Sequence, residues 1–299
     1  MSTGKLLPFF WQTIGRQGQL YGNRAYGNKV DCDNPHWFSY PGYSEMLVGF
    51  ADRKINSNRR EENPHQTILS FIHQKPEFRN KVAVFSTWGT IPYIAQSFTS
   101  GMHANAGHDL AAGDSLTAEE RFLNTLQTFM PNPNGERYDA FTFFYALEYM
   151  KRERPRVVYI SFDETDQHGH GARYDQYLLS AHRTDQMIAL LWQELATMDF
   201  YKDNTTLIIT TDHGRGKGGV RSFKKHGRLF FGSGQTWMAV LGPDTPPSGE
   251  VKTRARLYQC QLAQTIAAFL GVTYFNTRPV GDVIQTMLYP PESARTLSE

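Results

Sequence analysis

Short apolar runs alternate along this chain with longer stretches whose apolar residues recur every three or four positions. Runs rich in β-branched or aromatic residues predict four buried strands: Lys81–Phe85, Arg156–Phe162, Thr206–Thr211 and Thr236–Leu241. Apolar residues at helical spacing predict three helices: Asp139–Arg152, Tyr174–Ala196 and Gln259–Leu270. Strands that alternate with helices favour an α/β fold, in which helices cover both faces of a parallel or mixed sheet.

Polar clusters follow two of the predicted strands. The stretch D-E-T-D-Q-H-G-H-G occupies 163–171, directly after the strand 156–162. The stretch D-H-G-R-G occupies 212–216, directly after the strand 206–211. Ligands of such sheets bind beyond the carboxyl ends of the strands, so we expect these two clusters to share one rim.

Composition narrows the class of protein further. The 299 residues are 40% hydrophobic, enough for a large core, and we expect one domain over 1–299 with loop insertions near 101–135 and 214–235. Lys plus Arg number 31 against 29 Asp plus Glu, so no overall basic field indicates a nucleic-acid groove, although a local basic patch can serve a small anionic substrate. The sequence shows neither a membrane span nor a signal peptide, and the localisation stays open.

Five side chains in the two clusters and just beyond them form a candidate cation site. Asp166 and His170 lie in D-x-x-G-H, a glycine-containing turn in which a carboxylate and an imidazole can converge on one cation. Asp212 and His213 are adjacent, and His226 follows in K-K-H-G. This set of nitrogen and oxygen ligands suits zinc and, less selectively, manganese or iron. A polar turn would account for the first pair alone, but the ordered set of five favours a site for two divalent metal ions.

The ordered motifs resemble those of the alkaline phosphatase superfamily, and in particular its nucleotide pyrophosphatase/phosphodiesterase branch. The stretch Phe38-Ser39-Tyr40-Pro41, followed by Gly49, is similar to the nucleophile segment of that branch. The segment 55–58 (I-N-S-N) is similar to the one whose Asn holds phosphoryl oxygens. The resemblance implies a three-layer α/β/α sandwich with a mostly parallel central sheet.

The resemblance also implies a division of the metal ligands. Asp166, His170 and His226 would bind one metal, whereas Asp212 and His213 would bind the other. The Ser39 hydroxyl would lie beside the second metal. A serine so placed can act as an alkoxide nucleophile near neutral pH.

The implied activity is hydrolysis of small anionic phosphate mono- or diesters. Ser39 would displace an alcohol from phosphorus to give a phosphoserine, and water would then release phosphate. Asn58, or otherwise Asn56, would donate to the phosphoryl oxygens where charge develops. Arg215 and Lys225 are further candidate contacts for the anion.

One expected part of the family's fold is missing from the sequence. The family begins with a central strand that ends in Asp-Gly, and that Asp binds the metal on the Ser39 side. The first 38 residues contain no such strand, and Asp31 and Asp33 lie too close to Ser39 to replace it. The chain therefore resembles an N-terminally incomplete member, in which the second metal has only Asp212, His213 and Ser39.

Three alternative functions stay open. The missing Asp favours a non-catalytic metal- or anion-binding remnant of the fold. A sulfatase needs Cys or Ser in C/S-x-P-x-R, but Tyr43 stands here where Arg is required. A phosphomutase would need an insertion that the sequence does not show, and Ser44 is a rival to Ser39 as nucleophile. The leaving group and the oligomeric state are not indicated.

Overall fold

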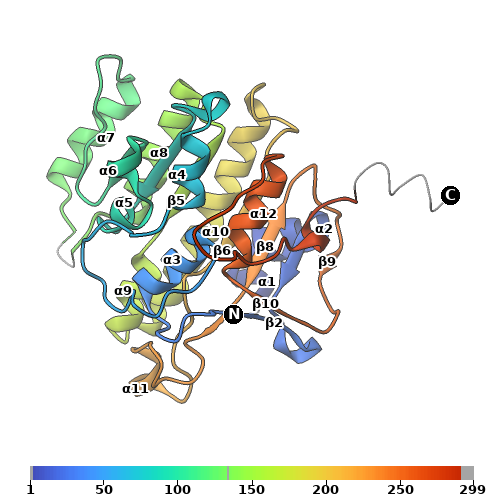
Figure 1. The fold of residues 1–299 in the computed structure, drawn as a ribbon. Coiled ribbons are helices and arrows are strands. Elements are labelled where there is room, and N and C mark those ends of the chain that lie inside the picture. Colours follow the sequence, from blue (N-terminus) through green and yellow to red (C-terminus); the bar gives the residue numbers. More distant parts are fainter. Residues whose placement is uncertain (1–2, 133–134, 291–299) are drawn as a thin grey trace.

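The computed structural model describes residues 3–132 and 135–290, and its strands form three sheets (Figure 1). The first sheet is entirely parallel, with β3 (Val82–Ser86) between β4 (His103–Ala106) and β5 (Val157–Ser161). Val84 faces Ala104 on one side and Tyr159 on the other. All five residues of β3 are buried, as expected for a strand paired on both edges and covered on both faces.

Each of the other two sheets contains both parallel and antiparallel strand pairs. Each also pairs a strand from the first 31 residues with strands from residues 235–258. One has the strand order β6 (Leu207–Thr210), β8 (Met238–Leu241), β1 (Gln19–Tyr21) and β9 (Gly249–Glu250). The other has the order β10 (Ala255–Tyr258), β2 (Asn28–Asp31) and β7 (Gln235–Thr236). β8 is antiparallel to both of its neighbours, whereas β10 is parallel to β2.

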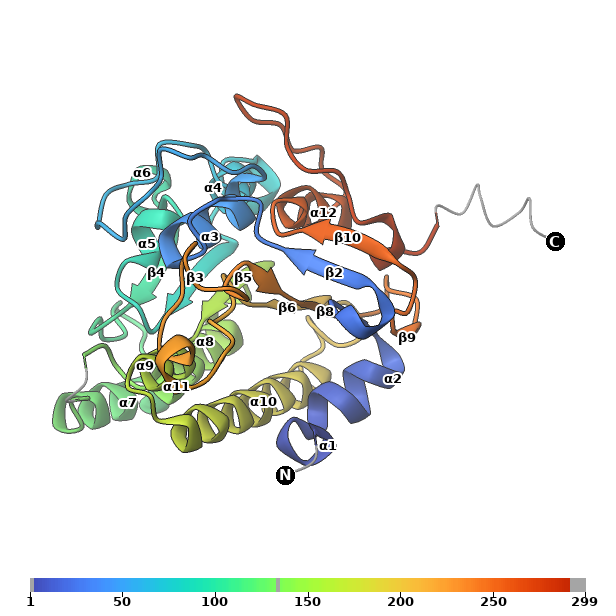
Figure 2. The same cartoon turned by 90° about the horizontal axis from the view of Figure 1, so that it is seen from below.

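Helices cover both faces of these strands, which Figure 2 shows as separate layers. One layer contains α3 (Ser39–Val48), α4 (Ile68–His73), α5 (Ile91–Ile94) and α12 (Gln261–Phe269). The other contains α7 (Ala118–Phe129), α8 (Asp139–Glu153) and α10 (Tyr174–Thr197). Side chains of β3 alternate between the layers, because Val82 and Val84 join one core cluster and Ala83 and Phe85 another.

The remaining helical segments are short. They are α1 (Thr3–Leu6), η1 (Phe10–Ile14), α2 (Gly15–Gln17), η2 (Arg24–Tyr26), η3 (Pro76–Phe78), α6 (Ser97–Ser100), α9 (Glu164–His170), α11 (Val220–Phe223) and η4 (Gln285–Met287). The chain between α1 and η1 lies on α10, where Asp185 accepts hydrogen bonds from the backbone N–H groups of Phe9 and Phe10, both at 2.9 Å. No described helix is both long and apolar enough to cross a membrane.

The predicted elements and the predicted fold class are confirmed. The four predicted strands appear as β3, β5, β6 and β8, and the three predicted helices as α8, α10 and α12. Their ends move by no more than two residues, the starts of β8 and α12 moving furthest. Helices on both faces of a sheet with a parallel part make this an α/β fold.

Two segments differ from the expectations. The interval 101–135 is more than an inserted loop, because it contributes β4 to the parallel sheet and forms α7; residues 133 and 134 of it lie outside the described part. The glycine-containing turn expected around Asp166 and His170 is instead the short helix α9. The interval 214–235 is loop, apart from α11 and the first residue of β7.

Candidate active site

The candidate nucleophile Ser39 is the first residue of α3. Its position is set by close packing of this helix against the loop after β6, because a Cβ on Gly42 would lie 2.2 Å from the Asp212 backbone oxygen. Tyr40, the next residue, donates its backbone N–H to Asn58 Oδ1 at 2.9 Å. The start of α3 is therefore held between the Asp212 loop and Asn58.

Asp166 and His170 lie four residues apart on α9, so that both side chains point to the same side of the helix. His170 Nε2 is 3.1 Å from Asp166 Oδ2. The start of this short helix is fixed from outside, because the buried carboxylate of Asp139 accepts hydrogen bonds from the backbone N–H groups of Asp163 (2.8 Å) and Glu164 (3.1 Å).

Asp212 and His213 follow β6 in a tightly packed loop. A Cβ on Gly214 would lie 2.4 Å from the backbone oxygen of Gln235, so no larger residue fits there without a shift of backbone. Gln259 donates to the Thr211 backbone oxygen, and Cys32 Sγ lies 3.5 Å from that of Asp212. Residues far apart in the sequence thus fix this loop.

The three predicted ligand segments meet in one place. Ligand atoms of Asp166, His213 and His226 all lie within 4.8 Å of one another. His226 Nε2 is 2.9 Å from His170 Nε2, and the His226 ring stacks on that of His213 with centroids 4.1 Å apart. Asp212 Oδ2 is 3.3 Å from His213 Nε2. All five predicted ligands therefore form one cluster, to which we refer as the Asp–His cluster.

Ser39 borders the Asp–His cluster. Its Oγ is 3.4 Å from His213 Nε2. The rival Ser44 is buried within α3, and its Oγ accepts a hydrogen bond from Asn63 Nδ2 at 3.0 Å. Of the two serines, only Ser39 contacts a candidate ligand among the described side chains.

Burial and neighbouring charges shift the pKa of several cluster members. Burial raises the pKa of Asp212 to about 6, and burial followed by repulsion from His213 lowers that of His226 to about 3. Burial also acts to raise the pKa of Asp166, but the hydrogen bond from His170 and the charges of His213 and Arg215 overcome it and hold this pKa well below its usual range. The hydrogen bond to Asp166 raises the pKa of His170.

The chemistry of the cluster fits a cation. The Nε2 atoms of His170 and His226 face each other, and the Asp166 carboxylate lies beside both, with Oδ1 3.9 Å from His226 Nε2. Neutral imidazoles and carboxylates that converge on one point are the ligand set that zinc prefers. Arg215 supplies positive charge from the side, since its Nη1 contacts Asp166 Oδ1.

The residues expected to contact phosphate differ in their burial and in their hydrogen-bond partners. Asn58 is exposed, and its amide nitrogen has no hydrogen-bond partner in the described part of the chain. The Arg215 Nη2 is buried and lacks a partner there as well. Asn56 is exposed, while the Lys225 ammonium lies 5.5 Å from the Phe230 ring centroid.

Two positioning residues were not singled out from the sequence. Asp139 fixes the start of α9 from 24 residues away, and the sequence gives no signal for this contact. Gly42 allows α3 to approach the Asp212 loop. Gly42 lies in the predicted nucleophile segment, and a glycine at such a position was the one sign in the sequence that this segment packs closely against another backbone.

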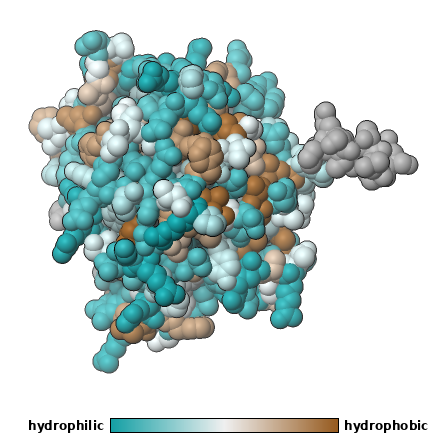
Figure 3. Space-filling view, viewed as in Figure 1, coloured by the Kyte–Doolittle hydropathy of each residue, from teal (hydrophilic) through white to brown (hydrophobic). Residues whose placement is uncertain are grey.

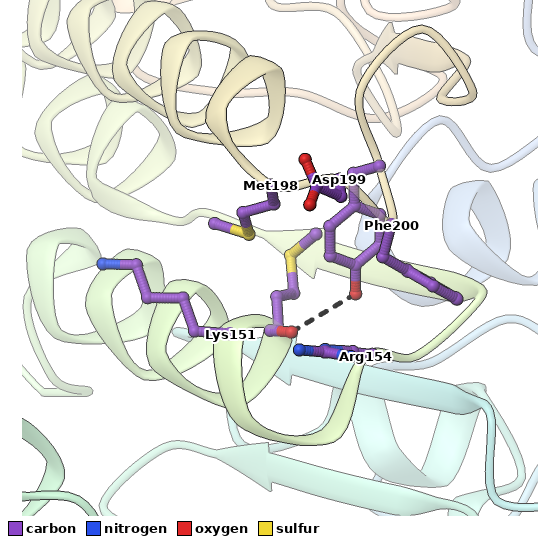
Figure 4. Close-up of a pocket in the computed structure, with 7 residues that line it drawn as sticks. Lys151, Arg154, Met198, Asp199 and Phe200 are labelled. Carbon is purple, nitrogen blue, oxygen red and sulfur yellow. Dashed lines mark hydrogen bonds between the residues drawn. The ribbon is translucent and has the colours of Figure 1, made fainter.

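A separate cavity of about 250 Å³ lies away from the cluster (Figure 4). Its lining comes from the end of α8 and the chain after α10, including Lys151, Arg154, Asp199 and Phe200. Tyr201, also in the lining, donates to the Pro155 backbone oxygen at 2.9 Å, just before β5 begins. The cavity therefore opens at the amino end of β5, whereas the Asp–His cluster lies at the carboxyl end.

The chain is similar to a known protein family. The family described as type I phosphodiesterase / nucleotide pyrophosphatase matches residues 8–222. A search of curated proteins finds no match.

Several solved structures share the fold. Alkaline phosphatase PafA is 9% identical with a TM-score of 0.64, over 96% of this chain and 96% of that chain. Phosphonate monoester hydrolase of Agrobacterium radiobacter is 12% identical with a TM-score of 0.59, over 94% of this chain and 72% of that one. The 2-O GAG sulfatase BT1596 is 13% identical with a TM-score of 0.59, over 92% and 67%.

Proposed function

Because the chain belongs to the type I phosphodiesterase and nucleotide pyrophosphatase family, within the alkaline phosphatase superfamily, we propose that it is a metal-dependent hydrolase of phosphate mono- or diesters with Ser39 as its nucleophile. One observation carries this proposal. Two aspartates and three histidines from three separate segments form one cluster, and the Ser39 hydroxyl borders it.

The cluster would hold one or two divalent ions. Asp166, His170 and His226 would bind one ion, and Asp212 and His213 a second beside Ser39. A divalent ion held there supplies positive charge for the phosphoryl oxygens and favours the ionised form of a nearby hydroxyl.

Ser39 would carry the transferred group. Its Oγ loses a proton to solvent and forms a bond to phosphorus, while the bond from phosphorus to the leaving alcohol breaks. The alcohol takes the electron pair and gains a proton from water. Water then attacks the phosphorus of the phosphoserine, which restores the Ser39 hydroxyl and releases phosphate from a monoester or a phosphomonoester from a diester.

Groups at the start of α3 would orient the phosphoryl oxygens. The helix has ten residues, so its dipole favours an anion beside Ser39. The Tyr40 N–H donates to Asn58 and Pro41 has no N–H, so the backbone N–H of Ser39 is the one left in the first turn to face such an anion. Asn58 has its carbonyl oxygen fixed by Tyr40 N, which leaves its amide N–H groups to donate. Charge that develops on the phosphoryl oxygens would be stabilised from this side.

The nucleophile assignment is tested with Ser39→Ala and with the rival variant Ser44→Ala. We expect Ser39→Ala to lose activity on p-nitrophenyl phosphate and its diester by about a thousandfold or more, because no other hydroxyl replaces Oγ. Its zinc content should stay that of the parent protein, since Oγ only borders the cluster. Ser44→Ala should keep most activity. Full activity of Ser39→Ala would contradict the assignment.

A further inference from the structure

The segment 217–231, to which we refer as the 217–231 loop, exposes a group of large apolar side chains. Three of the five most exposed large apolar side chains of the described part lie in it: Leu229 (83% exposed), Phe231 (73%) and Val220 (66%). Figure 3 shows apolar and hydrophilic side chains next to each other at the lower edge of the molecule, where Figure 1 places α11. Exposed apolar side chains that gather in one place indicate a surface that binds a partner.

The same loop is rich in positive charge. Between Asp212 and Asp244 the sequence contains no Asp or Glu. Five cationic side chains of the loop are exposed: Lys217, Arg221, Lys224, Lys225 and Arg228. None of the five forms an ion pair with a carboxylate of the described residues. Their charge is therefore available to an anionic partner.

Contacts at its base hold the 217–231 loop in a defined shape. The backbone N–H of Lys217 donates to the backbone oxygen of Phe231 at 2.9 Å, so the two ends of the loop are joined. Between these ends Phe223, which is half-buried, packs edge-on against Tyr177 of α10, with ring centroids 5.1 Å apart. The loop thus keeps one aromatic ring against the protein while its other large apolar side chains stay exposed.

The 217–231 loop borders the Asp–His cluster. His226 belongs to the loop, and its Nε2 lies 2.9 Å from His170 Nε2 on α9. In both Figure 1 and Figure 2, α11 lies beside α9. A partner bound to the loop would therefore lie next to the candidate active site.

We propose that the 217–231 loop binds the surface of a membrane that contains anionic lipids. Its cations pair with the lipid phosphates, and its apolar side chains enter the boundary between headgroups and acyl chains. The two kinds of side chain alternate closely enough to do both, because Val220 precedes Arg221 and Leu229 follows Arg228. Binding of this kind is reversible and needs no membrane-spanning helix.

Two other occupants match the loop less well. A soluble polyanion would pair with the cations but would leave the exposed apolar side chains in water. A second copy of this chain, bound through the same loop, would bring like charges together, which opposes association. A membrane surface with anionic lipids complements both the charge and the apolar side chains. This inference does not depend on the role of Ser39.

The test measures co-sedimentation of the whole protein with lipid vesicles. We expect binding to phosphatidylcholine vesicles that contain about 30% phosphatidylglycerol and much weaker binding to vesicles of phosphatidylcholine alone. Leu229→Ser combined with Phe231→Ser should weaken binding by about tenfold or more, because two large side chains no longer leave water. Arg221→Gln combined with Arg228→Gln should weaken it by about tenfold or more, since each cation contributes about fivefold.

Matched variants elsewhere on the surface are the controls. Phe129 of α7 and Phe275 are also exposed, so Phe129→Ser combined with Phe275→Ser should leave vesicle binding unchanged. Lys202→Gln combined with Lys252→Gln removes two exposed cations outside the loop and should leave it unchanged too. All four double variants should melt at the temperature of the parent protein, because they alter exposed side chains. Ser39→Ala should bind vesicles as the parent does, which separates this test from that of hydrolysis.

Three outcomes would overturn the proposal. The first is that the parent protein does not bind the anionic vesicles. The second is binding that the Leu229→Ser and Phe231→Ser variant keeps and that salt at about 1 M abolishes; if heparin competed for it, the loop would be assigned to a soluble polyanion. The third is a dimer in sedimentation velocity, formed without vesicles and dissociated by the same variant, which would assign the loop to a second copy.

Discussion

At the level of single side chains, the members of the Asp–His cluster differ in the charge that they carry near neutral pH. The lowered pKa values of Asp166 and His226 keep one ionised and the other neutral, which are the forms that bind a metal. Asp212, with a pKa of about 6, and His170, whose pKa is raised, must still release protons. The cluster is therefore only partly prepared for a cation.

We expect the affinity for zinc to rise with pH and then level off. Below about pH 6, protons on both Asp212 and His170 compete with the metal; above it Asp212 is deprotonated, and the competition ends only at the higher pH at which His170, whose pKa is raised, also loses its proton. Calorimetric titration of zinc between about pH 5 and pH 8, in buffers of different ionisation enthalpy, measures both the affinity and the protons released. An affinity that does not change over this range would contradict the assignment of these ligands, and Asp212→Asn should weaken the dependence.

Asn58 combines two roles that substitution can separate. Its Oδ1 holds the start of α3 through the backbone N–H of Tyr40, whereas its amide N–H groups face no described partner. We expect Asn58→Asp to keep the thermal stability, because a carboxylate oxygen still accepts from Tyr40. It should nevertheless lose about a hundredfold in kcat, because a carboxylate donates nothing to the phosphoryl oxygens and repels them.

Asn58→Ala is the matched comparison. It removes both the acceptor and the donor, so it should lower the free energy of unfolding by about 1 kcal/mol in addition to the loss of kcat. If Asn58→Asp kept full activity, the side chain would serve only to hold the helix start.

At the level of helices and strands, the contact of α3 with the loop after β6 sets the position of Ser39. Gly42 lies so close to the Asp212 backbone oxygen that a methyl group there must push the two segments apart. We expect Gly42→Ala to lower the free energy of unfolding by about 2 kcal/mol or more, measured by denaturant titration, and to reduce activity as Ser39 moves from His213.

Gly4→Ala in α1 is the control for that substitution. A Cβ at Gly4 meets nothing within 4 Å, so the change should leave activity unaltered and be neutral or stabilise by up to about 1 kcal/mol. Equal effects of the two substitutions would show that the Gly42 contact does not determine the geometry of the site.

Elements with a strong local signal could be predicted from the sequence, and those fixed by distant contacts could not. β3 and α10 follow directly from a continuous apolar run and a long helical repeat. α9 was expected as a turn because its sequence is polar and rich in glycine, and Asp139, which caps it, lies on α8. The short β1 (Q-L-Y) and β2 (N-K-V-D) were not predicted because neither contains the continuous apolar run that marks the equally short β6 and β8.

Across the entire chain, the Asp–His cluster joins two sheets that share no described strand pairing. His170 and Asp166 extend from the side of β5, whereas Asp212 and His213 extend from the side of β6. A cation bound by both groups would tie the sheets together at their carboxyl ends. The free energy of metal binding would then add to the free energy of unfolding of the protein.

We therefore expect zinc to raise the unfolding temperature and a chelator to lower it. Zinc at about 100 times its Kd should stabilise the folded state by about 2.7 kcal/mol, a shift of several degrees in a thermal melt. His226→Ala should remove most of this shift, since it deletes the ligand that contacts both His170 and His213. Identical melting temperatures with zinc and with chelator would argue against a resident ion.

The ordered motifs allowed the five members of the cluster to be identified from the sequence, but not the relation between the sheets. The motifs D-x-x-G-H and D-H-G can be recognised in the sequence because each follows a predicted strand. The structure brings Asp166 of the first motif and His213 of the second together. The assignment of β5 and β6 to different sheets has no such signature, because both runs are apolar whichever strands they pair with.

The strand order also dictates when each sheet can close during synthesis on the ribosome. The parallel sheet draws its strands from residues 82–161, so its last member emerges soon after its first. Among the described strands, β1 and β2 pair only with strands from residues 235–258. The nascent chain must therefore carry these two early segments unpaired until residues 235–258 have left the exit tunnel.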